Sequence, residues 1–402
     1  MISFHVIKPV KRILYFSFLL FILIPLGVFP QDEPGKKFTF DGYISNMQSI
    51  ISDSLKGNWI ADNLFHNRLN MNWFPSNNIT FSVQMRNRLM YGETVKYSPD
   101  YADGVDNDDG FMDLSMNIFN EQSFFLNSSI DRIYVQITKG KLVTTIGRQR
   151  VNWGISSVWN PNDIFNVQNY FDFDYIEKPG SDAIRLQYYT GASSSVEIAA
   201  KLDRDKRFTT AALYRFNTGG YDFQFMGGIL QENDYVAGLG WSGDIKNVGF
   251  KGEFSYFHPM KNARDTAGIF HLSLGGDYMF NNSLFLQLEA LFSKMPPGTS
   301  ISDFLSWYMG TLTVKNLSFT ELSLFGSLSY PISPLLNGNI AIMYFPDLQG
   351  FFAGPGIDFS LSDNMQFSLI LQVFSADLPD PITLEIKRNS LFLGFIRYKL
   401  SF

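Results

Sequence analysis

The sequence predicts an all-β fold, a transmembrane antiparallel up-and-down β-barrel of about 18 strands, with roughly 16 to 20 as the range. Three observations predict it. Apolar and polar residues alternate with a period of two from Phe38 to the end of the chain. Short polar turns alternate with longer connections. Aromatic residues make up 16% of the 402 residues and charged residues only 17%, whereas roughly 25% charge is usual in soluble domains.

Residues 1–30 are expected to be a secretory signal peptide, and residues 31–402 the barrel. Basic residues at positions 8, 11 and 12 precede an apolar run that ends at Pro30. An uncleaved membrane anchor is the alternative, but the run is short for a spanning helix. After Gln31 no apolar run approaches the roughly 18 residues of such a helix. The chain has no cysteine, which excludes a disulfide framework and thiolate metal sites.

Alternation occurs between Ile79 and Arg88, where the apolar residues Ile79, Phe81, Val83 and Met85 oppose the polar residues Thr80, Ser82, Gln84, Arg86 and Arg88. The same pattern recurs in residues 68–73, 132–138, 184–188 and 284–289. A membrane barrel explains it, because outward residues meet lipid and inward residues meet water. A soluble β-sandwich is the alternative, and the signal peptide together with the strand count favours the barrel.

Turn residues divide the chain into strands that run up and down. Short turns are expected at 75–78, 139–141, 190–192, 217–220, 281–282 and 362–364. Longer connections are expected at 49–61, 92–119, 153–181, 258–267, 293–320 and 376–389. An even strand number places both chain ends on the periplasmic side, so residues 304–314 are assigned to a loop.

The final strand, residues 391–402, carries an apolar face that ends on Phe402, with Arg397 and Lys399 on the other face. Such a strand resembles the signal by which the outer-membrane assembly machinery recognises its clients. We therefore expect an integral outer-membrane location, with that machinery, outer-membrane lipid and lipopolysaccharide as partners. The net charge of -6 argues against nucleic acid as a partner.

A set of arginines lies on strand faces opposite apolar residues, and we expect these arginines to form a basic wall lining the pore. Each would cost roughly 2–4 kcal/mol if it faced lipid near the midplane. Because Arg148 shares the parity of Leu142 and Ile146, a bulge at Gly147 is expected to turn it inward. The wall comprises Arg68, Arg86, Arg88, Arg132, Arg148, Arg150 and Arg185.

Residues 153–181 are expected to fold into the barrel as a constriction loop. The preceding strand is followed by turn residues at 160–163 and 178–180, which are typical of an irregular segment. Aromatic residues lie between these turns, and they can bury enough area to offset the entropy cost of ordering the segment. Acidic residues of the loop, facing the arginines, would narrow the lumen as in the eyelet of general porins. Alternatively, these charges neutralise one another in a plugged barrel. The residues assigned to the constriction are Trp153, Trp159, Asp163, Phe171, Asp172, Phe173, Asp174, Tyr175, Glu177 and Asp182.

The aromatic residues of the loop have two interpretations. As packing groups they give the loop a small core, which we favour. As functional groups they stack on sugar rings and guide a glycan through the lumen. The candidates for stacking are Trp153, Trp159, Phe171, Phe173 and Tyr175.

Catalysis is not expected. Outside the signal segment the histidines are His66, His258 and His271, and neither G-x-S-x-G nor H-E-x-x-H occurs. Residues 101–114 fit part of a calcium loop, but the first ligand position falls on Val105 and the closing position on Met116. We expect a solvated extracellular loop there, with a weak cation site as the alternative. No cofactor and no metal are expected.

The motifs GRQRVNWG, VWNPNDIFN, FDFDYIEKPGSDAIRLQYY and SYPISPLLNG resemble a porin-like outer-membrane β-barrel family of Gram-negative bacteria, and alginate-export-type porins more distantly. The resemblance is strongest over residues 131–189. It implies the barrel fold, and we expect a channel for passive passage of small polar or anionic solutes, narrowed by residues 153–181 against the arginine wall. The alternative is a plugged structural or binding barrel that serves a surface complex or the export of an oligosaccharide or polysaccharide. The signature positions are Arg148, Gln149, Arg150, Asn152, Trp153, Trp159, Asn160, Pro161, Asp163, Asp172, Asp174, Pro179, Gly180, Asp182 and Arg185.

Overall fold

Antiparallel strands form a single 19-stranded sheet in the computed structural model of the protein. The structure describes residues 37–167, 170–171, 177–261, 263, 266–294, 313–318, 320–379 and 385–402. The predicted signal peptide therefore lies outside the described residues, as do Asp172, Phe173, Asp174 and Tyr175 of the predicted constriction. Among the described residues, no helix combines the length and the apolar content needed to cross a membrane.

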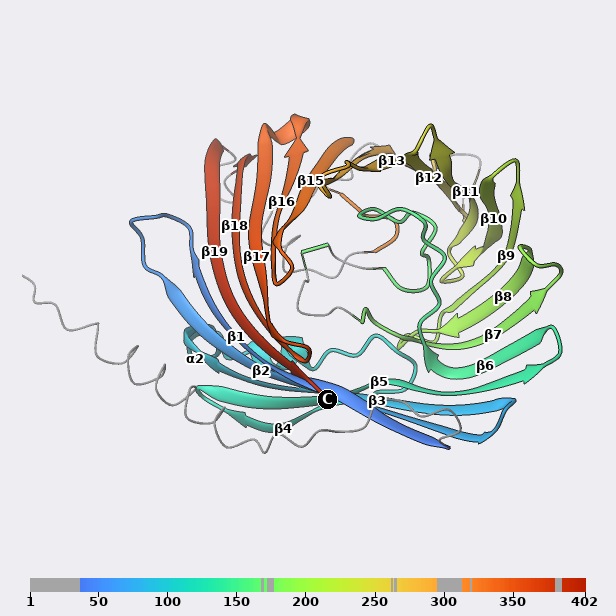
Figure 1. Cartoon of the computed structure of the whole chain (residues 1–402), viewed down its shortest axis with the longest axis horizontal. Coiled ribbons are helices and arrows are strands. Elements are labelled where there is room, and N and C mark those ends of the chain that lie inside the picture. The colour runs from blue at the N-terminus through green and yellow to red at the C-terminus, as the bar shows by residue number, and fades with distance from the viewer. Residues whose placement is uncertain are drawn as a thin grey trace, which may run out of the picture. The chain divides into compact units, whose positions relative to one another are not determined.

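The strands and short helices of the described residues follow one another along the chain (Figure 1). They are β1 (Phe38–Ser52), β2 (Ile60–Ser76), β3 (Ile79–Gly92), α2 (Glu93–Tyr97), α3 (Tyr101–Val105), β4 (Ser115–Glu121), β5 (Phe124–Lys139), β6 (Leu142–Gln149), β7 (Ser181–Tyr189), β8 (Ser195–Leu202), β9 (Phe208–Thr218), β10 (Tyr221–Leu230), β11 (Asp234–Ile245), β12 (Val248–Pro259), β13 (Ile269–Met279), β14 (Phe285–Lys294), β15 (Leu322–Ser333), β16 (Leu336–Phe345), η1 (Pro346–Leu348), β17 (Gly350–Ser362), β18 (Met365–Pro379) and β19 (Ile386–Ser401).

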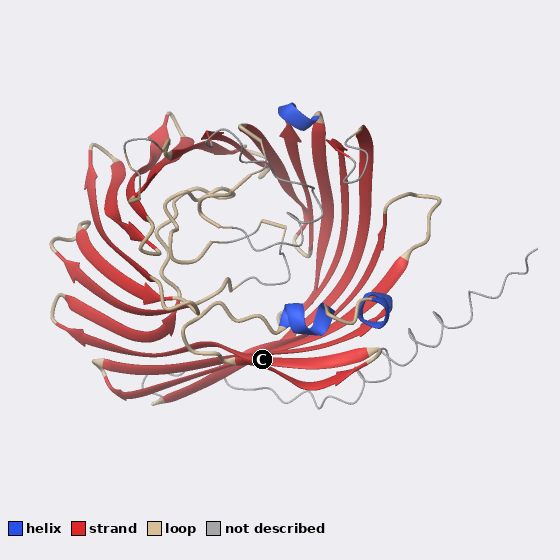
Figure 2. Ribbon diagram, turned by 180° about the vertical axis from the view of Figure 1, so that it is seen from behind, coloured by secondary structure: helices blue, strands red, loops and turns tan. Residues whose placement is uncertain are grey.

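The sheet closes on itself because β1 pairs with both β2 and β19. The main chains of Gly42 and Phe402 complete the seam, each amide donating to the other residue's carbonyl at 3.0 Å. Strand β4 pairs with β5 beside the ring, so the closed barrel has 18 strands. The predicted up-and-down barrel is therefore confirmed, and Figure 2 shows its strands surrounding an interior crossed by connecting segments.

The period-two pattern separates an apolar exterior from a polar and packed interior. On β14, for example, Leu288 is 55% exposed on the outside, whereas the neighbouring Glu289 is 3% exposed inside. On β7, Ile184 is exposed and Ala183 is buried. Outward residues have no protein neighbour to cover them, and in a membrane they meet lipid instead.

The long connections are shorter and more structured than the sequence suggests. The predicted connection 92–119 contains the helices α2 and α3 and the start of β4. The predicted connections 49–61 and 376–389 begin and end in strand, because β1, β2, β18 and β19 continue beyond the clear alternation. Of residues 304–314, the structure describes 313 and 314, which lie between β14 and β15 as predicted.

The bulge expected at Gly147 is wrong. Pairing of β6 with β5 and β7 runs through Gly147 without a register shift. The irregularity lies opposite, in β5, where Asp131 is the extra residue between the partners of Gln84 and Met85. Gly147 instead has a φ of 119°, a conformation that favours glycine, and Arg148 beyond it is buried.

We predict that Gly147→Ala destabilises the barrel by about 1–3 kcal/mol, because a Cβ there is strained in backbone conformation and in space. That Cβ would lie 2.3 Å from the carbonyl oxygen of Ile133. Urea unfolding of the barrel in lipid vesicles measures the change. Gly227→Ala is the matched control, since its Cβ would meet the Val236 carbonyl oxygen at an ordinary 3.8 Å. Equal unfolding midpoints for the two variants would contradict the prediction.

Candidate functional site

After β6 the chain enters the barrel as an inward segment, whose described residues are 151–167 and 170–171. The side chain of Gln224 on β10 donates to the Trp153 carbonyl at 2.7 Å. The side chain of Asn162 donates to the Leu239 carbonyl of β11 at 2.9 Å. The segment therefore lies against the inner face of the wall, and Figure 2 shows it among the loops inside the ring of strands.

Buried carboxylates of the wall hold this segment by its backbone. Glu253 of β12 accepts hydrogen bonds from the main-chain amides of Ile155, Ser156 at 2.6 Å and Asn162 at 2.9 Å. The glutamate is fully buried. Both of its oxygens accept amides, Oε1 from Ile155 and Ser156 and Oε2 from Asn162, so Glu253 fixes the turn at residues 155–162.

Glu289 of β14 repeats this arrangement one turn further along the segment. It accepts from the amides of Ser157 at 3.0 Å, Val158 at 3.1 Å and Trp159 at 2.8 Å. The hydroxyl of Ser273, on the strand between the two glutamates, donates to Glu289 and lies 3.1 Å from the Ser156 hydroxyl. Successive amides thus converge on one carboxylate, which leaves few orphan donors in the buried turn.

Glu197 of β8 provides a third anchor. It accepts from the indole Nε1 of Trp153 at 3.1 Å and forms ion pairs with Arg185 at 2.7 Å and Arg215 at 3.2 Å. Arg185 was expected in the basic wall, and its charge is neutralised here by a carboxylate of the next strand.

Apolar contacts complete the docking. Trp153 and Phe165 pack edge to face, with ring centroids 4.9 Å apart, in a cluster with residues of β7 to β12. Trp159 and Phe171 pack in a second cluster with residues of β14 to β18. Trp153, Trp159 and Phe171 are buried, which supports the packing interpretation. Closed off in this way, these rings cannot stack on a passing sugar.

A second inward segment, residues 313–318 between β14 and β15, was not predicted. Val314 joins the cluster around Trp153, and Leu317 joins the cluster around Trp159. Lys315 pairs with Asp234 of β11 at 2.8 Å. The sequence signal was an apolar pair at Val314 and Leu317 in a connection that was otherwise assigned to solvent.

The arginines of β2, β3 and β5 are held by polar neighbours. Arg68 is buried, pairs with Asp131 at 2.7 Å and lies 3.8 Å from the Glu177 carboxylate. Arg86 donates to His66 at 3.2 Å, and Arg88 donates to the side chain of Asn127 at 2.8 Å.

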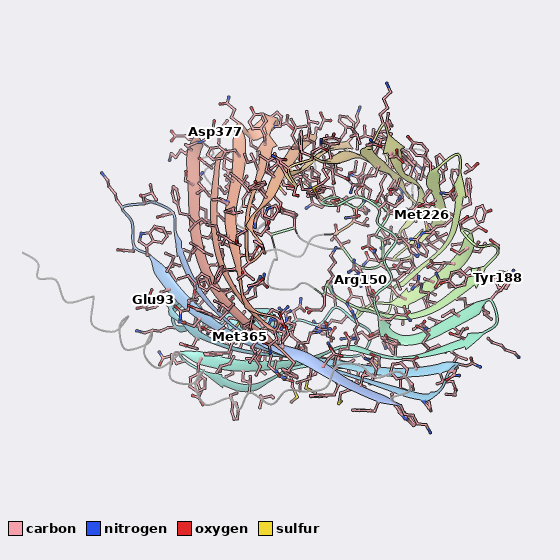
Figure 3. The ribbon with its side chains drawn as sticks, in the orientation of Figure 1. Glu93, Arg150, Tyr188, Met226, Met365 and Asp377 are labelled. Carbon is pink, nitrogen blue, oxygen red and sulfur yellow. The ribbon has the colours of Figure 1, made fainter. Side chains whose placement is uncertain are left out.

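The remaining arginines lie near the two ends of the loop. Arg132 donates to the backbone carbonyls of Glu177 and Lys178. Arg148 pairs with Asp182 at 2.7 Å and with Asp108 at 2.6 Å. Arg150 lies inside the ring of strands (Figure 3), and its Nε is buried without a hydrogen-bond partner.

The acidic residues of the loop do not share one environment. Glu177 approaches Arg68 and accepts from the Tyr43 hydroxyl at 3.2 Å. Asp182 pairs with Arg148, whereas Asp163 is buried and accepts from the Trp153 amide at 3.4 Å. Burial lowers the pKa of Lys178, and the nearby charge of Arg150 lowers it further, while Asp163 opposes the shift.

Two cavities flank the inward segment and share no lining residue. The larger cavity has a volume of about 870 Å³ and opens among the long connections. It is lined by side chains of both positive and negative charge, including Arg86, Arg88, Asp131, Lys201, Arg204 and Lys315. The smaller, about 490 Å³, lies toward the short turns and is lined by Asn152, Gly154, Ser194, Arg215 and Gln224. The inward segment therefore separates an outer from an inner polar space.

The described histidines, His66, His258 and His271, lie on three different strands. His66 is buried beside Arg86, and His258 lies near the end of β12 rather than in a loop as expected. The hydroxyl of Ser293 lies 2.8 Å from His271 Nδ1, but both residues are buried, so no substrate carbonyl can reach them.

The acidic stretch 101–114 is folded and internally bonded. Asp106 accepts from Ser115 at 2.6 Å and from the side chain of Asn127 at 3.0 Å. Burial alone would raise the pKa of Asp108, but the Arg148 guanidinium and the amides of Leu114 and Gly110 lower it overall. In the part of the chain that the structure describes, no group of three or more His, Asp or Glu side chains is placed to hold a metal ion.

No protein-family model and no curated protein matches the sequence. Solved structures of outer-membrane channels match the fold. They include Acinetobacter baumannii OccAB4, with a TM-score of 0.53, 10% identity and coverage of 92% of this chain and 100% of that one. Acinetobacter baumannii OccAB3 matches with a TM-score of 0.55 at 11% identity, over 90% of this chain and 99% of that one. Pseudomonas aeruginosa OccK11 (OpdR) matches with a TM-score of 0.54 at 9% identity, over 91% and 96%. These matches show the fold and confirm the predicted β-barrel architecture.

We predict that the double variant Glu253→Gln/Glu289→Gln loosens the inward segment without unfolding the barrel. Each substitution replaces one acceptor oxygen by an NH₂ donor that faces backbone amides, and a buried donor left without a partner costs about 1–3 kcal/mol. Amide hydrogen exchange of residues 155–162, measured by mass spectrometry, should accelerate at least tenfold. Asp222→Asn, in an exposed pair with Asn217, is the control. Unchanged exchange in the double variant would refute the anchoring role.

Proposed function

We propose that this porin-like barrel is a passive outer-membrane channel for small polar or anionic solutes, narrowed by residues 153–181 where they face the arginine wall. The arrangement that carries the proposal is the inward segment between two polar cavities. A solute that crosses the barrel must pass the strip of lumen beside that segment. Selection by charged side chains at such a point is a general mechanism of pores.

A small cationic cluster supports the preference for anions. Arg132 and Arg150 lie near each other and near Lys178. Most other arginines of the predicted wall are paired with carboxylates, as Arg68, Arg148 and Arg185 are. Paired charges contribute little net potential, so the cluster at Arg132, Arg150 and Lys178 is where we place the anion preference.

The alternative, a plugged structural or binding barrel serving a surface complex or glycan export, is favoured by one observation. Both inward segments are densely anchored, with buried glutamates beneath one and the Lys315–Asp234 pair beside the other. A segment fixed in this way does not move aside easily.

We further propose that the last strand is the element recognised by the barrel-assembly machinery. Phe402 closes the seam with Gly42 and stacks on Phe40 with ring centroids 6.0 Å apart. The exposed apolar exterior is the surface for outer-membrane lipid, with lipopolysaccharide at its outer rim.

Reversal potentials in planar bilayers test the anion preference. We predict that Arg132→Gln/Arg150→Gln lowers the anion-to-cation permeability ratio severalfold while current persists, because two positive charges are removed from the narrow part. Lys139→Gln, at the exposed end of β5, should leave the ratio unchanged. An unchanged ratio in the double variant would exclude the cluster as the selective element.

Replacing residues 153–171 by a short glycine-serine linker distinguishes the channel hypothesis from the plugged-barrel hypothesis. A channel conducts before the replacement and conducts more afterwards. A wild-type protein that stays silent in the bilayer, with current only after the replacement, would favour the plugged barrel.

A further inference from the structure

A row of polar side chains crosses the outer face of β2, β3 and β5. Asn67 of β2 is opposite Asn87 of β3, which is opposite Ser128 of β5. The adjacent positions Arg68 and Arg86 point inward to Asp131 and His66. Because successive strand residues face opposite sides, the row faces away from the lumen.

Hydrogen bonds link the side chains of the row to one another, but they do not use all of the donors and acceptors of these side chains. Asn87 Nδ2 donates to Asn67 Oδ1 at 3.1 Å, and the Ser128 hydroxyl donates to Asn87 Oδ1 at 2.7 Å. Asn67 Nδ2 donates to the Tyr43 carbonyl at 3.3 Å. A carboxamide has two N–H groups and an oxygen that accepts twice, so bonding capacity remains in each asparagine.

Asn46 of β1 adds an independent observation on the same face. It lies opposite Phe65, the second residue before Asn67, and it is only 4% exposed. Its Nδ2 has no hydrogen-bond partner. A buried amide donor left without a partner costs about 1–3 kcal/mol. Neighbouring side chains of this chain cover Asn46, so it extends the polar character of this face without itself contacting a partner.

The row lies at the depth of the hydrocarbon. Below it, Trp73 and Phe81 stack 5.1 Å apart on the outside, at the level expected for an aromatic girdle. Above it, Phe65 and Tyr91 stack at 6.4 Å. From Trp73 to Asn67 the tilted strand rises about 15 Å. On other walls the outward residues are apolar and exposed, for example Ile198, Leu288 and Ile342.

We propose that this polar row is the contact surface for a second copy of the chain within the membrane. Acyl chains offer no hydrogen-bonding groups, so lipid cannot satisfy the row. A soluble protein cannot reach this depth, and an embedded partner must itself carry outward polar groups there. This chain does. Because carboxamides both donate and accept, the row is complementary to itself across a two-fold axis.

Cross-linking of the purified full chain tests the proposal. Because the chain has no native cysteine, an introduced cysteine is the only thiol that can react. Leu69→Cys places a thiol on the outer face of β2 beside the row without changing it. Leu288→Cys is the control on the wall of β14. In lipid vesicles, a short thiol-specific bifunctional reagent should convert Leu69→Cys to a dimer and leave Leu288→Cys monomeric.

A second variant shows that the polar row is responsible. Adding Asn67→Leu, Asn87→Leu and Ser128→Ala to Leu69→Cys should raise the dimer dissociation constant about tenfold or more. Heat-dependent migration on gels confirms that both barrels are folded. Equal cross-linking at residues 69 and 288, a wild type that is monomeric at every concentration, or a dimer unaffected by the three substitutions would each overturn the proposal.

Discussion

Buried carboxylates of the barrel wall accept hydrogen bonds from backbone amides of the inward segment. These hydrogen bonds hold the segment in place inside the barrel. A segment that leaves a β-barrel wall and enters the interior loses its sheet partners, and its amides need new acceptors. Glu253 and Glu289 supply those acceptors at two neighbouring turns, and Glu197 fixes the indole at the entrance. The aromatic rings then bury their area on either side of these anchors. The interior is thereby divided into two polar spaces.

The wall itself is uneven, and the inward segments follow from that. Strands β6 and β8 have 8 residues each, whereas β2 has 17 and β5 and β19 have 16. Strand β6 pairs with residues 133–139 of β5, and β4 pairs with residues 124–129 of the same strand. The Arg148–Asp108 pair ties the connection before β4 to the top of the short strand. One arginine thus joins the barrel wall to the outer loop.

Much of the fold could be predicted from the sequence. Lipid on one side of the wall and water on the other require apolar and polar residues to alternate with a period of two along each strand. The strand number, the closure and the short turns followed from that constraint. Strand β4 did not, since Ser115–Glu121 lacks clear alternation and forms by pairing with β5. At the site, turn residues and aromatics identified the inward segment. Its anchors were missed because a glutamate such as Glu289, read along one strand, is indistinguishable from any lumen-facing polar residue. Arg68 and Arg185 were identified as inward, but their partners come from other strands, which local spacing does not reveal.

The measurement that tests the central claim most directly is disulfide formation between the inward segment and the wall. The hydroxyls of Ser156 and Ser273 lie 3.1 Å apart, and no other thiol competes in a chain without cysteine. In the variant Ser156→Cys/Ser273→Cys, mild oxidation of the folded barrel should yield a disulfide-linked peptide pair in nearly all molecules. The pair Ser156→Cys/Ser82→Cys, with the second thiol on β3, should yield none. Two freely reactive thiols in the first variant would contradict the account.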